Sequence, residues 1–324
     1  MRPGRPLSGS VMFAYIVRRI LATIPVMAVV AVFVFALLYL SPGDPAAIIA
    51  GDTATVDDIV RIRAKLGLDQ PVYIQFGGWV WRLLQGDLGI SIFTNLPVSK
   101  LVEQRLEPTV ALTITTLIVS VLAAIPMGVL AAWKAGSWID RAVMVFAVLG
   151  FSVPVFVLAY MLIFVFAIWA DLLPVQGYVS ITAGFWPFLS HIILPSTALG
   201  MVFAALIARI TRASMLDVLA QDYIRTAQAK GLSSEKVLIG HALKNAAVPI
   251  VTIIGIGVAL LIGGVVVTET VFAIPGLGRL TVDAILRRDY PIIQGIILIF
   301  SAAYVLVNLL VDLSYTLIDP RIRY

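Results

Sequence analysis

Few residues of this chain have the types and spacing that enzyme chemistry needs. There is no cysteine, which excludes a thiolate metal site, and the two histidines, His191 and His241, lie too far apart to indicate a histidine metal cluster. The sequence lacks the GxxxxGK(S/T) nucleotide-binding loop, the HExxH metal motif and the GxSxG nucleophile elbow. The glycine-rich turn Gly86–Ser91 is not followed by Lys-Ser or Lys-Thr, so it is not a phosphate-binding loop. We therefore predict no catalytic residue, no metal ligand and no enzyme activity in this chain.

Acidic side chains are scarce where the chain is most apolar. Six long runs carry no charged residue, whereas a proton-driven carrier usually needs ionisable groups within the membrane. Any driving energy is therefore expected to come from outside this chain. Glu269 directly follows the fifth of these runs, in the turn-rich stretch Thr268–Arg279. It could contact a cationic group of a substrate, or it could be solvated at the membrane surface.

The elements that hold these residues are predicted to be membrane-spanning helices. The chain has 324 residues, of which 60% are hydrophobic and 13% are charged, while a soluble domain carries about 25% charged residues. Each charge-free run exceeds the roughly 20 apolar residues that cross the hydrocarbon core, which predicts an all-α membrane protein with six transmembrane helices. In the fourth run a stretch rich in Gly and Pro comes first, so its helix is expected from about His191 to Ser214. The six runs are Ile20–Gly43, Pro108–Trp133, Ala142–Ala170, Leu172–Ala208, Asn245–Thr268 and Tyr290–Val311.

Basic residues predict the orientation of these helices. Most of them fall in the terminal segments and in the short connections that are cytoplasmic if the N-terminus is inside, so both termini are predicted to be cytoplasmic. The run after Arg18 and Arg19 is too long for a signal peptide and lacks a cleavage site, which favours an uncleaved first helix. Met1 and Met12 both remain possible start residues.

Three regions are expected along the chain. Residues 1–11 are predicted to be a disordered extension. Residues 12–108 hold the first helix and a long extracytoplasmic loop, which contains an amphipathic helix at about Thr55–Leu66. Residues 109–324 form a core of five further helices. Pro154 interrupts the third run and is expected to kink its helix, either as a packing feature or as a hinge.

The fifth run carries small residues at four-residue intervals, at Gly255, Ala259 and Gly263. Small residues at this spacing let helices approach closely, so these three positions are predicted to be a helix-packing face.

The segment Asp217–Pro249 is a long polar stretch between apolar runs, and it reads as two short helices. An apolar face is expected on the first helix at Leu216, Leu219, Tyr223 and Ala227, and that face needs a partner. Gly231 then ends the helix with a left-handed residue. Ser233 or Ser234 is expected to cap the second helix.

This segment resembles the cytoplasmic coupling loop of binding-protein-dependent ABC importer permeases. The general pattern of that family has Glu-Ala-Ala before the glycine, whereas this sequence has Arg225, Thr226 and Ala227, as in the dipeptide/oligopeptide/nickel branch. Further segments resemble the same branch, so the resemblance covers nearly the whole chain: Gly86–Ser91, Leu173–Gly177, Glu269–Arg279, Asp289–Gln294 and Asp319–Tyr324. The residues to which the resemblance gives a role in coupling to an ATPase are Asp222, Tyr223, Arg225, Thr226, Ala227, Ala229, Lys230, Gly231, His241, Leu243 and Asn245.

The resemblance implies the fold of a type I ABC importer permease and a place in the bacterial cytoplasmic (inner) membrane. The implied partners are a second homologous permease subunit, two ATP-binding subunits, an extracytoplasmic substrate-binding protein and membrane lipid, with no nucleic acid. ATP and Mg²⁺ would bind the partner ATPases, and this chain would hold no cofactor. The residues expected to form an outer gate or to contact the binding protein are Glu269, Phe272, Pro275, Gly276 and Gly278.

The resemblance leaves the substrate open among dipeptides, oligopeptides, glutathione, nickel chelates and opines, with peptides expected first. The alternative function is a stand-alone channel or secondary carrier for a small solute, which would transport without an ATPase. A membrane-embedded enzyme and a DNA-binding helix-turn-helix protein fit less well, because no catalytic motif is present and the flanking apolar runs leave little room for a free domain.

Overall fold

The computed structural model describes residues 9–40, 44, 46–47, 55–65 and 67–318. These residues form helices and no strand, with an isolated β-bridge between Ile90 and Pro97. The N-terminal extension predicted to be disordered lies outside the described residues at positions 1–8, and helix α1 begins at Gly9. The terminal segment Asp319–Tyr324 also lies outside them.

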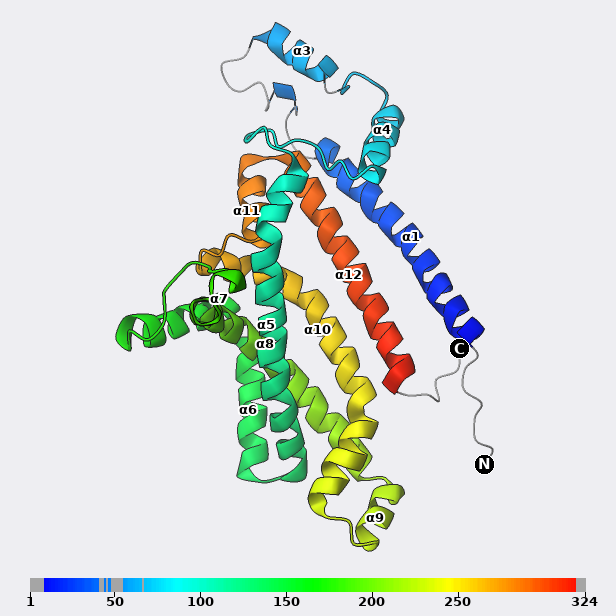
Figure 1. Cartoon of the computed structure of the whole chain (residues 1–324), viewed down its shortest axis with the longest axis vertical. Coiled ribbons are helices and arrows are strands. Elements are labelled where there is room, and N and C mark those ends of the chain that lie inside the picture. Colours follow the sequence, from blue (N-terminus) through cyan, green and yellow to red (C-terminus); the bar gives the residue numbers. More distant parts are fainter. Residues whose placement is uncertain (1–8, 41–43, 45, 48–54, 66, 319–324) are drawn as a thin grey trace. The chain divides into compact units, whose positions relative to one another are not determined.

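Helices of very different lengths follow one another along the chain (Figure 1). They are α1 (Gly9–Leu40), α3 (Val56–Lys65), α4 (Val72–Leu84), α5 (Val98–Trp133), α6 (Trp138–Ser152), α7 (Val155–Leu162), the π-helix η1 (Ile163–Trp169), the 3₁₀ turn η2 (Ile181–Ala183), α8 (Phe185–Leu219), α9 (Asp222–Ala229), the π-helix η3 (Lys236–Leu243), α10 (Lys244–Val271), α11 (Leu277–Arg287) and α12 (Tyr290–Ile318).

Among the described residues, five helical stretches are long and apolar enough to cross a membrane: Val17–Leu40, Val98–Trp133, Phe185–Leu219, Lys236–Val258 and Tyr290–Ser314. The bent pair formed by α6 and the α7–η1 helix, whose axes differ by 106°, is also apolar enough, and it makes a sixth span if the pair crosses the membrane as one unit. The bend lies at Pro154, where a kink was predicted. Proline disfavours helical geometry in the residue before it, and Val153 is accordingly extended, with ψ 124°.

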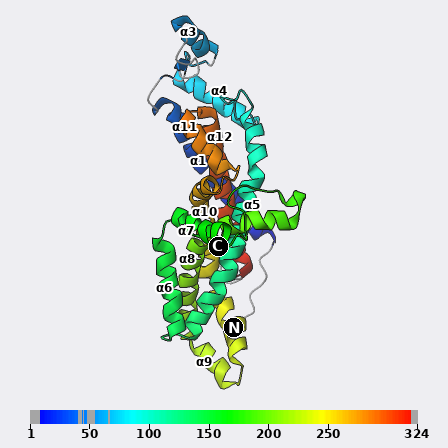
Figure 2. The same ribbon diagram turned by 90° about the vertical axis from the view of Figure 1, so that its left-hand side faces the viewer.

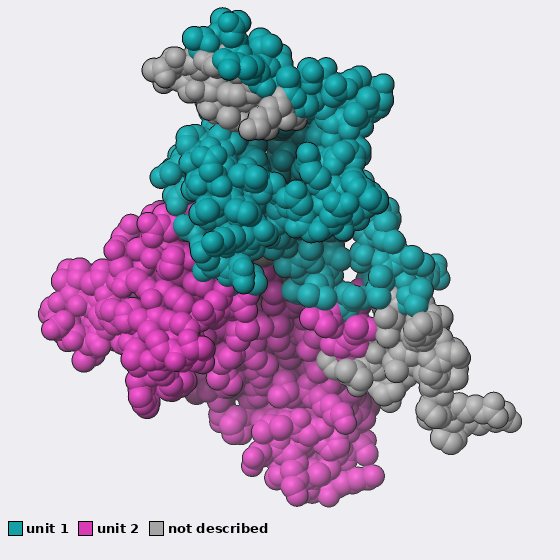
Figure 3. All heavy atoms as spheres, turned by 45° about the horizontal axis from the view of Figure 1, so that its top comes forward, with its two compact units in different colours: residues 1–106, 280–309 teal, residues 107–279, 310–324 magenta. Residues whose placement is uncertain are grey.

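The chain divides into two compact units, coloured separately in Figure 3. Unit 1 comprises residues 1–106 and 280–309, and unit 2 comprises residues 107–279 and 310–324. Residues 280–309 therefore group with the first part of the chain in this division, and the predicted five-helix core over residues 109–324 stays a prediction.

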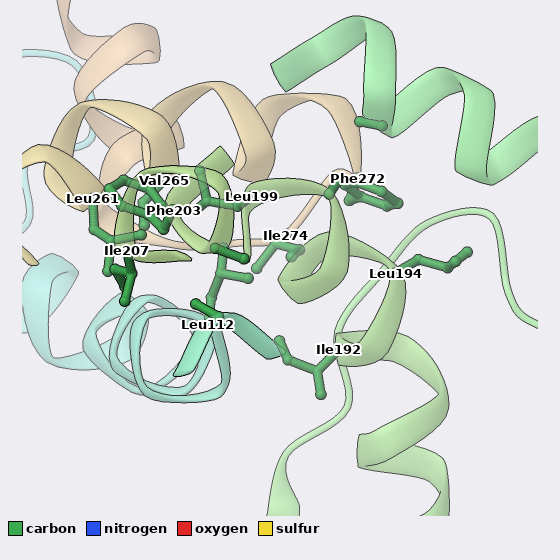
Figure 4. Packing of buried hydrophobic residues seen from close by; sticks show 14 of the residues in the cluster. Leu112, Ile192, Leu194, Leu199, Phe203, Ile207, Leu261, Val265, Phe272 and Ile274 are labelled. Carbon is green, nitrogen blue, oxygen red and sulfur yellow. The ribbon is translucent and has the colours of Figure 1, made fainter. Parts of the chain in front are cut away.

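The core of unit 2 is built around α8. Leu199, Phe203 and Ile207 of this helix are buried, and they pack with Leu112 of α5 and Leu261 of α10 (Figure 4). Close approach of α5 and α8 is also supported by polar contacts. Thr115 Oγ1 and Ser196 Oγ lie 2.6 Å apart, and Ser120 Oγ donates to the Gly200 carbonyl at 3.1 Å. Such pairs satisfy hydroxyl groups within the membrane while holding two helices together.

The structure corrects two predicted helix boundaries. Helix α8 begins at Phe185 and not near His191, because Gly184, with φ 142°, marks the end of the preceding loop. The second short helix of the polar segment is not separate. It begins near Lys236 and continues without interruption into α10, so the fifth span starts earlier than its charge-free run. The amphipathic helix expected at Thr55–Leu66 is confirmed as α3.

Candidate coupling site

The polar segment between α8 and α10 begins with a break in the helix. The chain turns at Ala220 and becomes extended at Gln221, with ψ 147°, before α9 starts at Asp222. Asp222 lies in the first turn of α9, where a negative charge is favourable, and its carbonyl accepts a hydrogen bond from Thr226 Oγ1. In both orthogonal views α9 lies at one extremity of unit 2, beside the start of α10 (Figures 1 and 2).

Gly231 ends α9 in the left-handed conformation that its sequence position predicts. Its φ is +78°, and its amide donates to the Gln228 carbonyl at 2.9 Å. A Cβ atom at this position would meet no heavy atom within 4 Å. The requirement for glycine here is therefore one of backbone conformation and not of space.

The apolar face of α9 differs from the one predicted. Leu216 and Leu219 belong to α8, and the side chain of Tyr223 is 44% exposed. The break at Gln221 shifts the helical register, so the buried residues of α9 are Ile224 and Ala227. They pack within the chain, in a cluster that also contains Met215, Val237, Leu238, Ala242, Ala246, Ile250 and Ala132.

Most of the residues predicted to couple to an ATPase form the exposed surface of this segment. The exposed ones are Asp222, Tyr223, Arg225, Thr226, Ala229, Lys230, Gly231 and Asn245, whereas Ala227 is buried and His241 and Leu243 are partly buried. Asn245 Nδ2 donates to the His241 carbonyl at 2.6 Å. The ion pair between Asp222 and Arg225 is solvent-exposed at 3.6 Å, so it stabilises α9 only weakly. The residue at the N-cap of η3 is Glu235, and its side chain makes no capping hydrogen bond. The predicted cap by Ser233 or Ser234 is therefore not found at this position.

An ion pair that sequence reasoning missed joins α6 to α8. Arg212 donates to both carboxylate oxygens of Asp140, with 2.7 Å from Nη2 to Oδ2, and Asp140 is only 4% exposed. The Gly136 amide also donates to Asp140, at 2.9 Å. Two parallel bonds from a guanidinium fix the geometry of the pair. The α5–α6 turn is therefore attached to the part of α8 that precedes α9.

Glu269, at the other end of α10, is fully buried, so of the two alternatives that the sequence left open the solvated carboxylate is wrong. It accepts hydrogen bonds from Thr109 Oγ1 at 2.5 Å and from the Arg279 amide at 2.9 Å. Thr109 Oγ1 in turn accepts from the Leu277 amide at 2.8 Å. A buried carboxylate needs such partners, because burial of an unpaired charge is very unfavourable.

Two further residues of the predicted outer gate, Gly276 and Gly278, lie against this carboxylate. Phe272, Gly276 and Gly278 are buried, and only Pro275 is exposed. A Cβ atom on Gly276 would overlap the Glu269 carboxylate.

The loop before α8 packs onto the same region of unit 2. The Gly177 amide donates to the Phe272 carbonyl at 2.9 Å, and Tyr178 and Ser180 both donate to Glu107. Burial, and then the hydrogen bond to Glu107, raise the pKa of the Tyr178 hydroxyl well above its usual value, so it stays protonated.

Two family comparisons identify the chain. Residues 124–324 match the family described as binding-protein-dependent transport system inner membrane component, and residues 12–113 match the N-terminal part of such membrane components. The chain belongs to this permease family. The prediction of an inner-membrane permease is thereby confirmed, and a stand-alone channel or carrier is not favoured.

Curated relatives support the assignment along the full length of the permease. The probable peptide ABC transporter permease protein y4tP of Sinorhizobium fredii is 57% identical over 313 residues, which cover 97% of this chain and 100% of that protein. The glutathione transport system permease protein GsiC of Escherichia coli O6:H1 is 45% identical with the same coverage.

Solved structures confirm the permease fold. A chain of the inward-facing MetNI methionine ABC transporter matches with a TM-score of 0.57 at 17% identity, covering 68% of this chain and 97% of that chain. This likeness confirms the all-α fold of an ABC importer permease. The extracytoplasmic location of the segment after α1 stays a prediction.

The predicted helix-packing residues of the permease differ in their surroundings. Gly255 is buried, and a Cβ atom there would overlap Val311 of α12. Gly263 is exposed and has no heavy atom within 4 Å of that position, and the side chain of Ala259 lies outside the described residues. Gly264 lies against Leu199 instead. The role of Gly263 in packing stays a prediction.

Two segments of the permease that were matched only by resemblance meet in unit 1. Ser91 Oγ donates to Asp289 Oδ2 at 2.6 Å, and the Ile92 amide donates to Asp289 Oδ1 at 3.3 Å. Both Ser91 and Asp289 are buried. The contact closes the Gly86–Ser91 turn over the start of α12, which gives this turn a structural role in unit 1.

Proposed function

We propose that this chain is the membrane-spanning subunit of an ATP-driven importer, and that it moves di- and oligopeptides inward by alternating access. The substrate class is supported by the names of the relatives, which describe transport of peptides and of glutathione. Glutathione is itself a tripeptide, so one pathway that accepts short peptide backbones accounts for both names.

The observation that supports the proposal is that α9 is packed on one side and exposed on the other. Ile224 and Ala227 attach α9 to a buried cluster that includes Met215 of α8 and Ile250 of α10. The opposite surface of α9, with Tyr223 and Arg225, is exposed. A push on that surface would pass through the cluster to two spans at once, and packed cores transmit such displacements as rigid bodies.

The partner that pushes is an ATP-binding subunit. Two such subunits would bind ATP and Mg²⁺ and dock on the cytoplasmic side, one of them on α9, and a second, homologous permease would complete the pathway. Both termini of this chain would then be cytoplasmic, in agreement with the distribution of its basic residues. The coupling surface would comprise the exposed residues of α9 together with Lys230, Gly231 and Asn245.

An extracytoplasmic binding protein would deliver the peptide at the opposite end of α10. There the exposed Pro275 would contact the binding protein, while the buried Glu269 would hold the segment in shape. The buried residues Phe272, Gly276 and Gly278 would stabilise the conformation of this segment.

Substitution of Gly231 by proline tests the coupling role. Proline cannot adopt φ +78° and removes the amide that donates to Gln228, so the end of α9 must rearrange. We expect Gly231→Pro to abolish ATP-dependent uptake of a labelled dipeptide by membrane vesicles, with an unchanged amount of subunit in the membrane. Gly240→Ala is the matched control, because Gly240 is also exposed with open space around it but has helical backbone geometry.

Normal uptake by the Gly231→Pro variant would exclude the coupling role. Uptake that needs no ATP would instead support a carrier. Competition by glutathione and by longer peptides in the same assay would define the substrate range.

A further inference from the structure

Helix α4 is apolar on nearly every side. Its sequence is VYIQFGGWVWRLL, in which only Gln75 and Arg82 are polar. These two residues are seven positions apart, so they lie on one narrow flank of the helix. A helix in contact with water on its free side normally carries polar residues there.

One face of α4 packs on the end of the first span. The rings of Phe76 and Trp79 lie with their centroids 5.2 Å and 5.6 Å from that of Phe35 in α1, and Tyr39 of α1 donates a hydrogen bond to Gln75. Figure 1 shows α4 beside the end of α1. All of these residues belong to unit 1.

A second face of α4, adjacent to the one that packs on α1, is apolar and exposed. Tyr73, Trp81 and Leu84 are 75%, 64% and 74% exposed, and their spacing places them along one side of the helix. None of the residues of α4 is fully buried. Burial of three such side chains would stabilise the protein by several kcal/mol, so leaving them in water is unfavourable.

The contact with α1 determines the depth of α4 relative to the membrane. The first span runs from Val17 to Leu40, and Phe35 precedes its end by roughly 7.5 Å at 1.5 Å per residue. Helices that lie in a membrane surface bury their apolar face about 5–10 Å into the boundary between headgroups and acyl chains. Helix α4 is therefore held at the level of this boundary.

We propose that α4 is a membrane-surface helix, with Tyr73, Trp81 and Leu84 inserted among lipid headgroups and the adjoining acyl chains. Tyrosine and tryptophan are enriched at this level of the bilayer. Arg82, on the polar flank, can extend its guanidinium towards lipid phosphates while its aliphatic part stays in the apolar region. The proposal depends on α1 being a membrane span and not on the identity of the transported solute.

Helix α3 supplies the contrast within the same connecting segment. It has the sequence VDDIVRIRAK, and its residues Asp57, Val60 and Arg63 are exposed. Arg63 also donates to Asp44 at 2.5 Å. Five charged residues among ten favour water around α3, so it serves as an internal reference for α4.

Single cysteines test this proposal directly, because the natural chain has none. We would place one cysteine in each variant, Trp81→Cys or Tyr73→Cys on α4 and Val60→Cys on α3, and attach a polarity-sensitive fluorophore. The labelled permease, purified with its co-purifying subunits, would be reconstituted into vesicles that contain lipids brominated near the headgroup. We expect roughly threefold stronger quenching for both α4 positions than for Val60→Cys, with blue-shifted emission.

The same samples show whether lipid, water or a protein partner contacts the exposed face of α4. Equal quenching at α4 and α3 would overturn the proposal, since it would place α4 in water. A label on α4 that is unaffected by brominated lipid, but becomes protected when purified binding protein is added, would also overturn it in favour of a protein partner. Because Trp81 and Tyr73 are exposed, their replacement leaves the packing on α1 intact, and agreement between the two positions excludes a local unfolding artefact.

Discussion

Glycine-containing turns precede and follow the continuous η3–α10 helix, and they differ in structure. At one end, Gly231 has a left-handed backbone and open space around it. At the other end, Gly276 and Gly278 are buried against the carboxylate of Glu269, and a Cβ atom on either would come too close to neighbouring atoms. The first turn therefore presents a surface, whereas the second is a tightly packed, internally hydrogen-bonded structure.

This difference separates two kinds of polar residue in a membrane protein. Arg225 and Lys230 at the coupling end are exposed, so they are available to another subunit. Glu269 at the opposite end is satisfied inside the chain by the Thr109 hydroxyl and by the Arg279 amide. Substitutions at the buried end should thus change stability, and substitutions at the exposed end should change coupling.

The largest effect on stability is expected from Gly276→Ala. The added methyl group overlaps the Glu269 carboxylate, and overpacking at a rigid buried site costs about 1–3 kcal/mol, with more lost as hydrogen bonds break. The midpoint of thermal unfolding in detergent should fall clearly below that of Gly240→Ala. An unchanged midpoint would show that the turn can shift without loss.

Arg212→Ala should lower the free energy of unfolding by a nearly equal amount. It leaves Asp140 buried without its guanidinium partner, and breaking a buried ion pair costs roughly 3 kcal/mol. Asp140→Asn combined with Arg212→Ala should recover part of this loss. Strictly additive losses in this double-mutant cycle would contradict a direct interaction between the two side chains.

Glu269→Gln should have a moderate effect. The amide keeps one acceptor oxygen but replaces the other with a donor that faces the Arg279 amide or Thr109, which costs about 1–2 kcal/mol. Glu269→Ala should destabilise the protein more than Glu269→Gln does. If uptake were lost in Glu269→Gln while thermal stability stayed normal, Glu269 would instead act in transport.

The smallest effect on stability is expected from Tyr223→Ala. Its side chain lies on the exposed surface of α9, so the free energy of unfolding should change by less than about 0.5 kcal/mol. Co-purification of the ATPase subunits and ATP-dependent uptake should nevertheless decrease. A stability loss as large as that of Gly276→Ala would remove the distinction between the two ends of α10.

Features that depend on local sequence were predictable. Charge-free runs located the spans, Pro154 predicted the bend between α6 and α7, and Gly231 predicted a left-handed helix end. Each depends on a few adjacent residues and on the solvent around them.

Features that depend on distant partners were missed. Asp140 and Arg212 are 72 positions apart, and Thr109 and Glu269 are 160 apart. The sequence therefore left solvation of Glu269 open, because nothing near this residue in sequence indicates the Thr109 hydroxyl and the Arg279 amide that bind it. The face of α9 was misplaced because the extended residue Gln221 separates α9 from α8, so Leu216 and Leu219 do not share a helix with Ala227.

The hydrogen bond between Ser91 and Asp289 also sets an order of events during synthesis. Its partners are separated by 198 positions, so at about 5–20 residues per second Ser91 leaves the ribosome roughly 10–40 s before Asp289. Until then the amide of Ile92 and the hydroxyl of Ser91 lack the carboxylate that they bind in the folded chain. Unit 1, which contains α1, therefore cannot be completed until residues 280–309 have been made, and a nascent chain that stalls before Asp289 leaves the Gly86–Ser91 turn without its carboxylate partner.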